Sequence, residues 1–149
     1  MAKNPMIIIL LIALIAVIYF FFLNNPPLDT VKVNIKGTQF NLEVAKTIPQ
    51  KSLGLGKRES LCQNCGMLFT WSFPQPLTFW MKDTLIPLDI IFIDSNGKVI
   101  NLVTANPEPG ISDFKLTQYS SATLAQYVIE LNAGSAVKLN LQPGDVIQL

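Results

Sequence analysis

Apolar and polar residues alternate along much of the chain after residue 30, and this period of two predicts β-strands. Val31, Val33 and Ile35 alternate with polar residues, and a turn at Lys36-Gly37 leads toward a second strand. The predicted strands cover residues 31–36, 38–45, 66–69, 77–83, 87–94, 98–105, 127–132 and 146–149. The segment 127–132 also fits a helix that begins at Ala122, but its β-branched residues favour a strand.

Turn and capping residues divide these strands. Ser95-Asn96-Gly97 is typical of a tight hairpin turn. Thr47 is a suitable cap for a short helix toward Leu55, and Ser135 is a suitable cap for a helical turn to Asn140. Seven or eight short strands with one or two short helices predict a mainly β, compact, barrel-like single domain.

The one long apolar segment lies near the N-terminus, at residues 6–23, and contains no charged residue. As a helix it would extend about 27 Å, close to the thickness of a hydrocarbon core. No small-residue cleavage site follows it, so it predicts an uncleaved signal anchor. The predicted order is a tail (1–5), a transmembrane helix (6–23), a linker (24–30) and a β-rich extracytoplasmic domain (31–149), with the N-terminus inside.

Composition excludes several classes of function. Of 149 residues, 50% are hydrophobic and 14% charged, the net charge is +1, and histidine is absent. Histidine-based triads, bases and metal sites are therefore excluded. A near-neutral domain also argues against nucleic-acid partners, which require a basic surface. We predict no cofactor and no metal.

Cys62 and Cys65 form the pattern C-x-x-C. Two thiolates make half a zinc site, and no histidine or second cysteine pair completes it. A thioredoxin-like motif would precede a helix within a βαβ unit, whereas a strand is predicted to follow here. A small structural disulfide in an oxidising compartment is the preferred interpretation.

A family resemblance rests on several stretches of the chain. They are Gly54-Leu55, Arg58, Leu61, GMLF at 66–69, FWMKDTLIPLDI at 79–90, YVIELNAG at 127–134 and PGD at 143–145. With these the chain resembles domain-of-unknown-function family 192 over nearly all of residues 31–149. The resemblance implies a small, mainly β prokaryotic domain, often exported or membrane-attached, with no established activity. Asp83 replaces the asparagine usual in this family, Gly56 replaces a common methionine, and the cysteine pair is not a general family feature.

Arg58 and Asp89 are the first candidate binding residues. Asp89 shares a strand face with Ile91 and Ile93, so its carboxylate is expected to be partly buried and paired. Arg58, the only arginine, is the expected partner because it can bind a carboxylate bidentately. The pair is either a structural ion pair or part of a ligand or acid–base site.

The remaining candidates are Trp80, Lys82, Asp83, Glu130 and Asn132. Trp80 and Lys82, with Thr84, would line a pocket if their strand face is not part of the core. Asp83 is typical of a turn residue. Glu130 and Asn132 share the strand face of Val128, where polar side chains are usually solvated.

Three functions remain open. The preferred one is a binding module for a small ligand or a protein partner. The second is a structural accessory subunit that docks a membrane complex through an apolar surface. The third is an enzyme that uses Asp89, Asp83 or Glu130 as acid or base, although no spacing selects a carboxylate pair.

Overall fold

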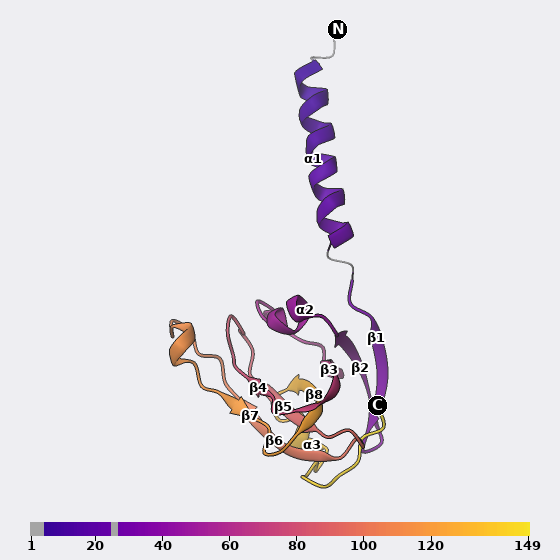
Figure 1. Ribbon diagram of the computed structural model, residues 1–149, viewed down its shortest axis with the longest axis vertical. Helices are drawn as coiled ribbons and strands as arrows, with labels where there is room; N and C mark the ends of the chain where they lie inside the picture. Colours follow the sequence, from indigo (N-terminus) through magenta and orange to yellow (C-terminus); the bar gives the residue numbers. More distant parts are fainter. Residues whose placement is uncertain (1–4, 25–26) are drawn as a thin grey trace.

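The computed structural model describes residues 5–24 and 27–149, without the side chains of residue 5 and residues 18–24. Helix α1 (Pro5–Asn24) lies outside the β-rich part of the chain (Figure 1). The predicted tail lies outside the described residues except for Pro5, as do residues 25 and 26 of the predicted linker.

The prediction of a membrane anchor is contradicted. Among the described residues, no helix combines the length and the apolar character that a membrane span requires. The predicted localisation, a single-pass protein with its N-terminus inside, is therefore corrected.

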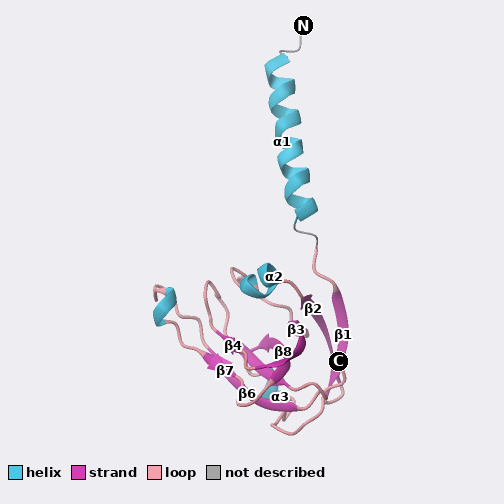
Figure 2. Cartoon of the chain, viewed as in Figure 1, coloured by secondary structure: helices cyan, strands magenta, loops and turns pink. Residues whose placement is uncertain are grey.

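The β-rich part, whose strands are magenta in Figure 2, is built on one six-stranded sheet with the order β1-β2-β3-β8-β5-β6. Its strands are β1 (Thr30–Ile35), β2 (Thr38–Ala45), β3 (Cys65–Gln75), β8 (Ala125–Asn132), β5 (Leu88–Ile93) and β6 (Val99–Ala105). All neighbouring pairs are antiparallel except β2 and β3. That parallel pair needs a crossover, which contains α2 (Ile48–Leu53).

The sheet is open, so the barrel-like part of the predicted fold is wrong. Strands β1 and β6 are its two edges and do not pair with each other. The C-terminal segment runs along β6 instead, where the Val99 amide donates to the Asp145 carbonyl over 2.8 Å. The mainly β class with few short helices is confirmed.

The local predictions for turns and helices hold in most cases. Thr47 caps α2 with a full capping box, and the hairpin turn at residues 95–97 joins β5 to β6. Segment 127–132 is part of a strand, β8. In contrast, the N-cap of α3 (Ser135–Lys138) is Gly134, and Ser135 is the first residue of the helix rather than its cap.

Two predicted strands are corrected. Segment 77–83 is a strand only at β4 (Thr78–Phe79), which pairs with β7 (Tyr119–Ser120) in a second small sheet. It ends early because a turn follows, in which the Thr84 amide donates to the Met81 carbonyl. Segment 146–149 forms only an isolated bridge between Lys98 and Val146.

Both faces of the sheet are covered by apolar side chains. One core lies around Phe40, Ile91 and Ile129, beneath α3 and the C-terminal segment. The other lies around Phe69, Phe92 and Val128. Strand β5 is buried along its whole length because it lies between both cores. A polar side chain on the central strands must therefore find a partner or a cavity.

Candidate functional site

Glu130 places a carboxyl group in the core around Phe69, Phe92 and Val128. It lies on β8 opposite Met67 of β3 and Ile90 of β5. Only 5% of its surface is exposed. The prediction that this strand face is solvated at Glu130 is therefore wrong, because the chain segments before β3 and after β4 cover it.

The Glu130 carboxyl has no hydrogen-bond or ion-pair partner among the described residues. Among these residues, every side-chain nitrogen or oxygen atom that is fully shielded from solvent has a hydrogen-bond partner. The Glu130 oxygens must therefore reach a solvent-accessible space. Burial raises the pKa of Glu130 to about 8, so the group is mostly protonated at pH 7.

That space is a pocket of about 60 Å³. A volume of this size holds water or a compact chemical group. It brings together three predicted site residues, Trp80, Lys82 and Glu130, together with Thr84. Its full lining is Lys51, Ser52, Leu53, Gly54, Leu55, Phe69, Phe79, Trp80, Lys82, Thr84 and Glu130.

Aromatic rings form a fixed wall of the pocket. Phe69 and Phe79 pack edge to face with centroids 4.9 Å apart, and Phe79 packs on Phe92 in the same way at 5.9 Å. The end of α2 lines the pocket beside this wall, and Gly54 there has a φ of 51°. A Cβ at Gly54 would make only ordinary contact with the Phe69 ring, at 3.4 Å, so the left-handed backbone rather than lack of space favours glycine at this position.

The rim of the pocket is aromatic and cationic. Trp80 is 47% exposed, and the Lys51 ammonium lies 4.2 Å from the centroid of the Trp71 ring. Partial burial lowers the pKa of Lys51. Lys82 forms an ion pair with Asp113, whose hydrogen bond raises the pKa of the lysine.

The Asp89 carboxylate makes structural hydrogen bonds and does not face a cleft. It is fully buried and accepts two hydrogen bonds. The Thr104 hydroxyl donates to Oδ1 over 2.7 Å, and the Ala136 amide donates to Oδ2 over 2.8 Å. Asp89 therefore ties the edge strand β6 and helix α3 to the centre of the sheet.

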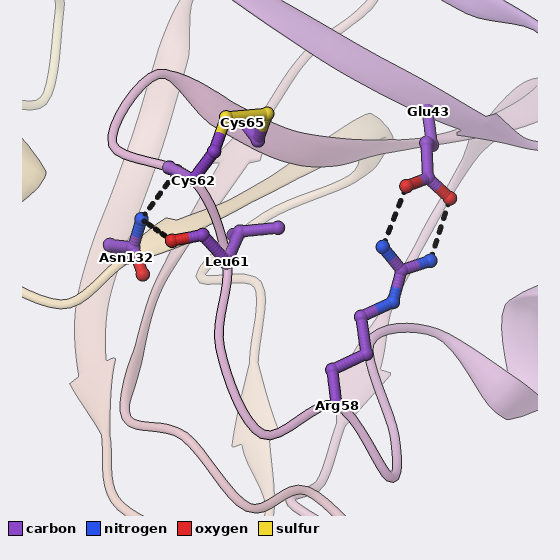
Figure 3. Close-up of a disulfide and its surroundings, with 6 residues drawn as sticks. All are labelled: Glu43, Arg58, Leu61, Cys62, Cys65 and Asn132. Carbon is purple, nitrogen blue, oxygen red and sulfur yellow. Dashed lines mark hydrogen bonds and ion pairs between the residues drawn. A yellow bond between two sulfur atoms is a disulfide. The ribbon is translucent and has the colours of Figure 1, made fainter.

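Arg58 pairs with Glu43 and not with Asp89, which corrects the predicted ion pair. The guanidinium Nη1 donates to Oε1 of Glu43 and Nη2 donates to Oε2, each over 2.6 Å (Figure 3). The hydrogen bond lowers the pKa of Glu43 and raises that of Arg58. The pairing joins β2 to the loop before β3, so Arg58 and Asp89 do not form one site.

The other candidates are placed apart from the Glu130 pocket. Asp83 lies in the turn after β4, with a φ of 53°. The Asn132 amide donates to the carbonyl groups of Leu61 and Cys62 (Figure 3). A disulfide joins Cys62 and Cys65, with Cα atoms 5.1 Å apart. In the described part of the chain, acidic residues and cysteines nowhere form a group of three that could hold a metal ion.

Several pocket residues escaped the sequence interpretation. Lys51 and Phe69 are not among the predicted site residues, although Lys51 lies in the predicted helix and Phe69 ends the predicted strand 66–69, which is part of the longer β3. Glu43 was also missed as the partner of Arg58. The sequence carries no signal that would select these residues. Each is brought to its partners only by the crossover between β2 and β3.

Comparison with known proteins places this fold in a family. The model of domain-of-unknown-function family 192, described as "Uncharacterized ACR", matches residues 31–149. The chain belongs to this family. No curated protein matches the chain. The resemblance noted in the sequence is thereby confirmed, and family 192 has no characterised activity to transfer.

Two solved structures are similar to this family 192 chain. One, from Sinorhizobium meliloti, is titled a "putative transcription regulator"; it is 31% identical with a TM-score of 0.70, and the match covers 80% of this chain and 91% of that one. The other is a protein of unknown function from Novosphingobium aromaticivorans. It is 33% identical with a TM-score of 0.68, and the match covers 82% of this chain and 85% of that one.

Proposed function

We propose that the domain binds a small ligand, which inserts a compact uncharged hydrogen-bonding group into the pocket at Glu130. The supporting observation is the buried Glu130 carboxyl, which has no partner among the described residues and faces a cavity. An unpaired polar group in a core lowers stability. Such a cost is typical of positions that serve function rather than folding.

The protonated state of Glu130 defines the ligand chemistry. A neutral carboxyl donates one hydrogen bond through its hydroxyl group and accepts another at its carbonyl oxygen. An amide presents the complementary carbonyl oxygen and N–H. The pocket volume of about 60 Å³ suits a group of that size, and the exposed Trp80 ring at the rim offers a surface for the rest of the ligand.

Catalysis by paired carboxylates is not favoured by this arrangement. Glu130 is the only carboxyl among the described residues that line the pocket. Two-carboxylate hydrolysis needs a second carboxyl group about 5–10 Å away across the substrate. Asp89 is engaged by Thr104 and Ala136, so it does not supply that group.

Acetamide and N-methylacetamide test the proposal by NMR titration of the full-length chain at pH 6.5. We expect saturable shifts at Gly54 and at the Trp80 indole. Glu130→Leu, which removes both hydrogen bonds, should weaken binding at least about ten-fold, equivalent to about 1.4 kcal/mol. Glu130→Gln should retain binding because glutamine keeps a donor and an acceptor.

Exposed Lys32, far from this pocket in the sequence and absent from its lining, offers the matched control Lys32→Gln. This variant should bind as the wild type does. For the wild type, binding should also weaken as the pH rises through about 8, where Glu130 ionises. Equal affinity of the wild type and Glu130→Leu for both amides would contradict the proposal.

A further inference from the structure

A second pocket, separate from the one at Glu130, lies beside the disulfide loop and helix α3. Its volume is about 440 Å³, within the range of small-molecule sites. It shares no lining residue with the Glu130 pocket. Apolar contact surface comes from Phe40, Leu61 and Leu139, and the remaining lining is mostly polar.

Ser135 is the polar group that points to a ligand. Only 9% of its surface is exposed, and its hydroxyl has no hydrogen-bond partner among the described residues. Polar side-chain atoms of these residues that are fully shielded from solvent all have partners, so the Ser135 hydroxyl retains access to solvent, and Ser135 lines this pocket. A nearly buried hydroxyl that faces a cavity offers one donor and its acceptor sites to an occupant.

Asn132 and Lys138 add to this polar set. The Asn132 amide nitrogen is committed to the carbonyl groups of Leu61 and Cys62 (Figure 3), while the described residues provide no donor for its Oδ1. Lys138 follows Ser135 by three positions on α3, so the two side chains lie on the same side of the helix. Among the described residues, no carboxylate forms an ion pair with Lys138.

The charge of the pocket is set by that lysine. The lining includes Lys138 but no aspartate or glutamate. Asp89 accepts from the Ala136 amide of α3 from within the sheet, and its carboxylate is satisfied there. The single arginine, Arg58, is held by Glu43. One cation with neutral donors fits one negative charge better than a phosphate dianion, for which arginine is the usual bidentate partner.

The loop wall of this pocket is held in place by several bonds. The Cys62–Cys65 disulfide closes the segment that contributes Gln63 and Asn64 to the lining. The backbone carbonyl of Asn64 accepts a hydrogen bond from the backbone N–H of Asn41 over 2.9 Å, which attaches the same loop to β2. Pre-organised walls reduce the entropy lost on binding.

We propose that this pocket binds a small monocarboxylate with an apolar body. The carboxylate is held by the Lys138 ammonium and the Ser135 hydroxyl, and the apolar body packs on Phe40, Leu61 and Leu139. The site is independent of the one at Glu130, which takes an uncharged group. The two pockets give the domain two ligands of different chemistry.

Benzoate tests this proposal by NMR titration of the full-length chain, with benzamide as the uncharged probe of the same shape. We expect saturable benzoate shifts at Asn132, Ser135 and Lys138, and binding of benzamide at least about ten-fold weaker. Lys138→Gln should weaken benzoate binding about five-fold or more, and Ser135→Ala about three-fold or more. Lys32→Gln, which removes an exposed cation from β1, should leave it unchanged.

Glu130→Leu separates the two sites, because it should not alter benzoate binding. Benzoate shifts that stay linear without saturation would overturn the proposal. So would equal binding of benzamide, or benzoate affinity unchanged by Lys138→Gln. Loss of benzoate binding in Glu130→Leu would assign the benzoate to the other pocket and overturn this one.

Discussion

Glu130→Gln is expected to stabilise the domain at neutral and alkaline pH and to remove most of the pH dependence of its unfolding. Burial raises the pKa of Glu130 to about 8 from an ordinary value of 4.5. The folded state therefore holds a proton that the unfolded state releases. Where the folded state binds more protons, the free energy of unfolding falls as the pH rises.

The pH window follows from these two values. Below about pH 4.5 the Glu130 carboxyl is protonated in both the folded and the unfolded state, so it does not lower the free energy of unfolding. Between about pH 4.5 and pH 8 the free energy of unfolding of the wild type falls by about 1.4 kcal/mol for each pH unit. Glutamine cannot ionise, so the free energy of unfolding of the variant should exceed that of the wild type by about 3 kcal/mol at pH 7.

Urea unfolding between about pH 5 and pH 9, followed by tryptophan fluorescence, measures this effect. Glu59→Gln is the control because Glu59 is an exposed carboxylate, and its profile should follow that of the wild type. Parallel pH profiles for the wild type and Glu130→Gln would show that Glu130 is not protonated in the folded protein. They would also remove the basis for an uncharged ligand group at this pocket.

Asp89→Ala is expected to destabilise the domain by about 3 kcal/mol or more. The substitution leaves two groups without their acceptor, the Thr104 hydroxyl and the Ala136 amide. Their hydrogen bonds attach the edge strand β6 and helix α3 to β5. An unsatisfied buried donor costs about 1–3 kcal/mol, and the cavity adds to that loss.

Asp89→Asn and Thr104→Val separate the contributions. Asparagine keeps the size of the side chain and one acceptor, so Asp89→Asn should lower the free energy of unfolding clearly less than Asp89→Ala does. Thr104→Val removes one donor and should cost about 1 kcal/mol. A double-mutant cycle between positions 89 and 104, measured by urea unfolding, gives the coupling energy.

An unfolding free energy of Asp89→Ala close to that of the wild type would refute the structural role. Amide hydrogen exchange provides an independent test, since faster exchange at Ala136 is expected when α3 loses its contact. Unchanged exchange at Ala136 in a destabilised variant would show that the loss arises elsewhere in the sheet.

Local sequence signals were reliable where neighbouring residues decide the structure. The strand at residues 31–36, predicted from alternation, and the helix cap at Thr47 are both confirmed. Strand 77–83 was not, because its apolar residues belong partly to a turn whose Met81 side chain is buried. Periodicity does not separate a strand from a turn packed on the core.

The choice of ion-pair partner shows a limit of a different kind. The apolar neighbours of Asp89 in the strand predict partial burial of its carboxylate, and the structure buries it fully. Its expected partner Arg58 is instead bound to Glu43, on a strand that joins the sheet beside β3. Any of the ten acidic residues could have been chosen from the sequence, since geometry alone decides which carboxylate meets the single guanidinium.

The class of the fold, most of its strands and the family of the chain follow from the amino-acid pattern alone, because they depend on local patterning and on the residues themselves. The same pattern places Glu130 on a strand face with Val128. That α2 and the segment after β4 cover this face and enclose a pocket is apparent only in the folded chain. Whether a polar side chain is solvated or buried depends on segments distant in the sequence, and so does the function proposed for Glu130.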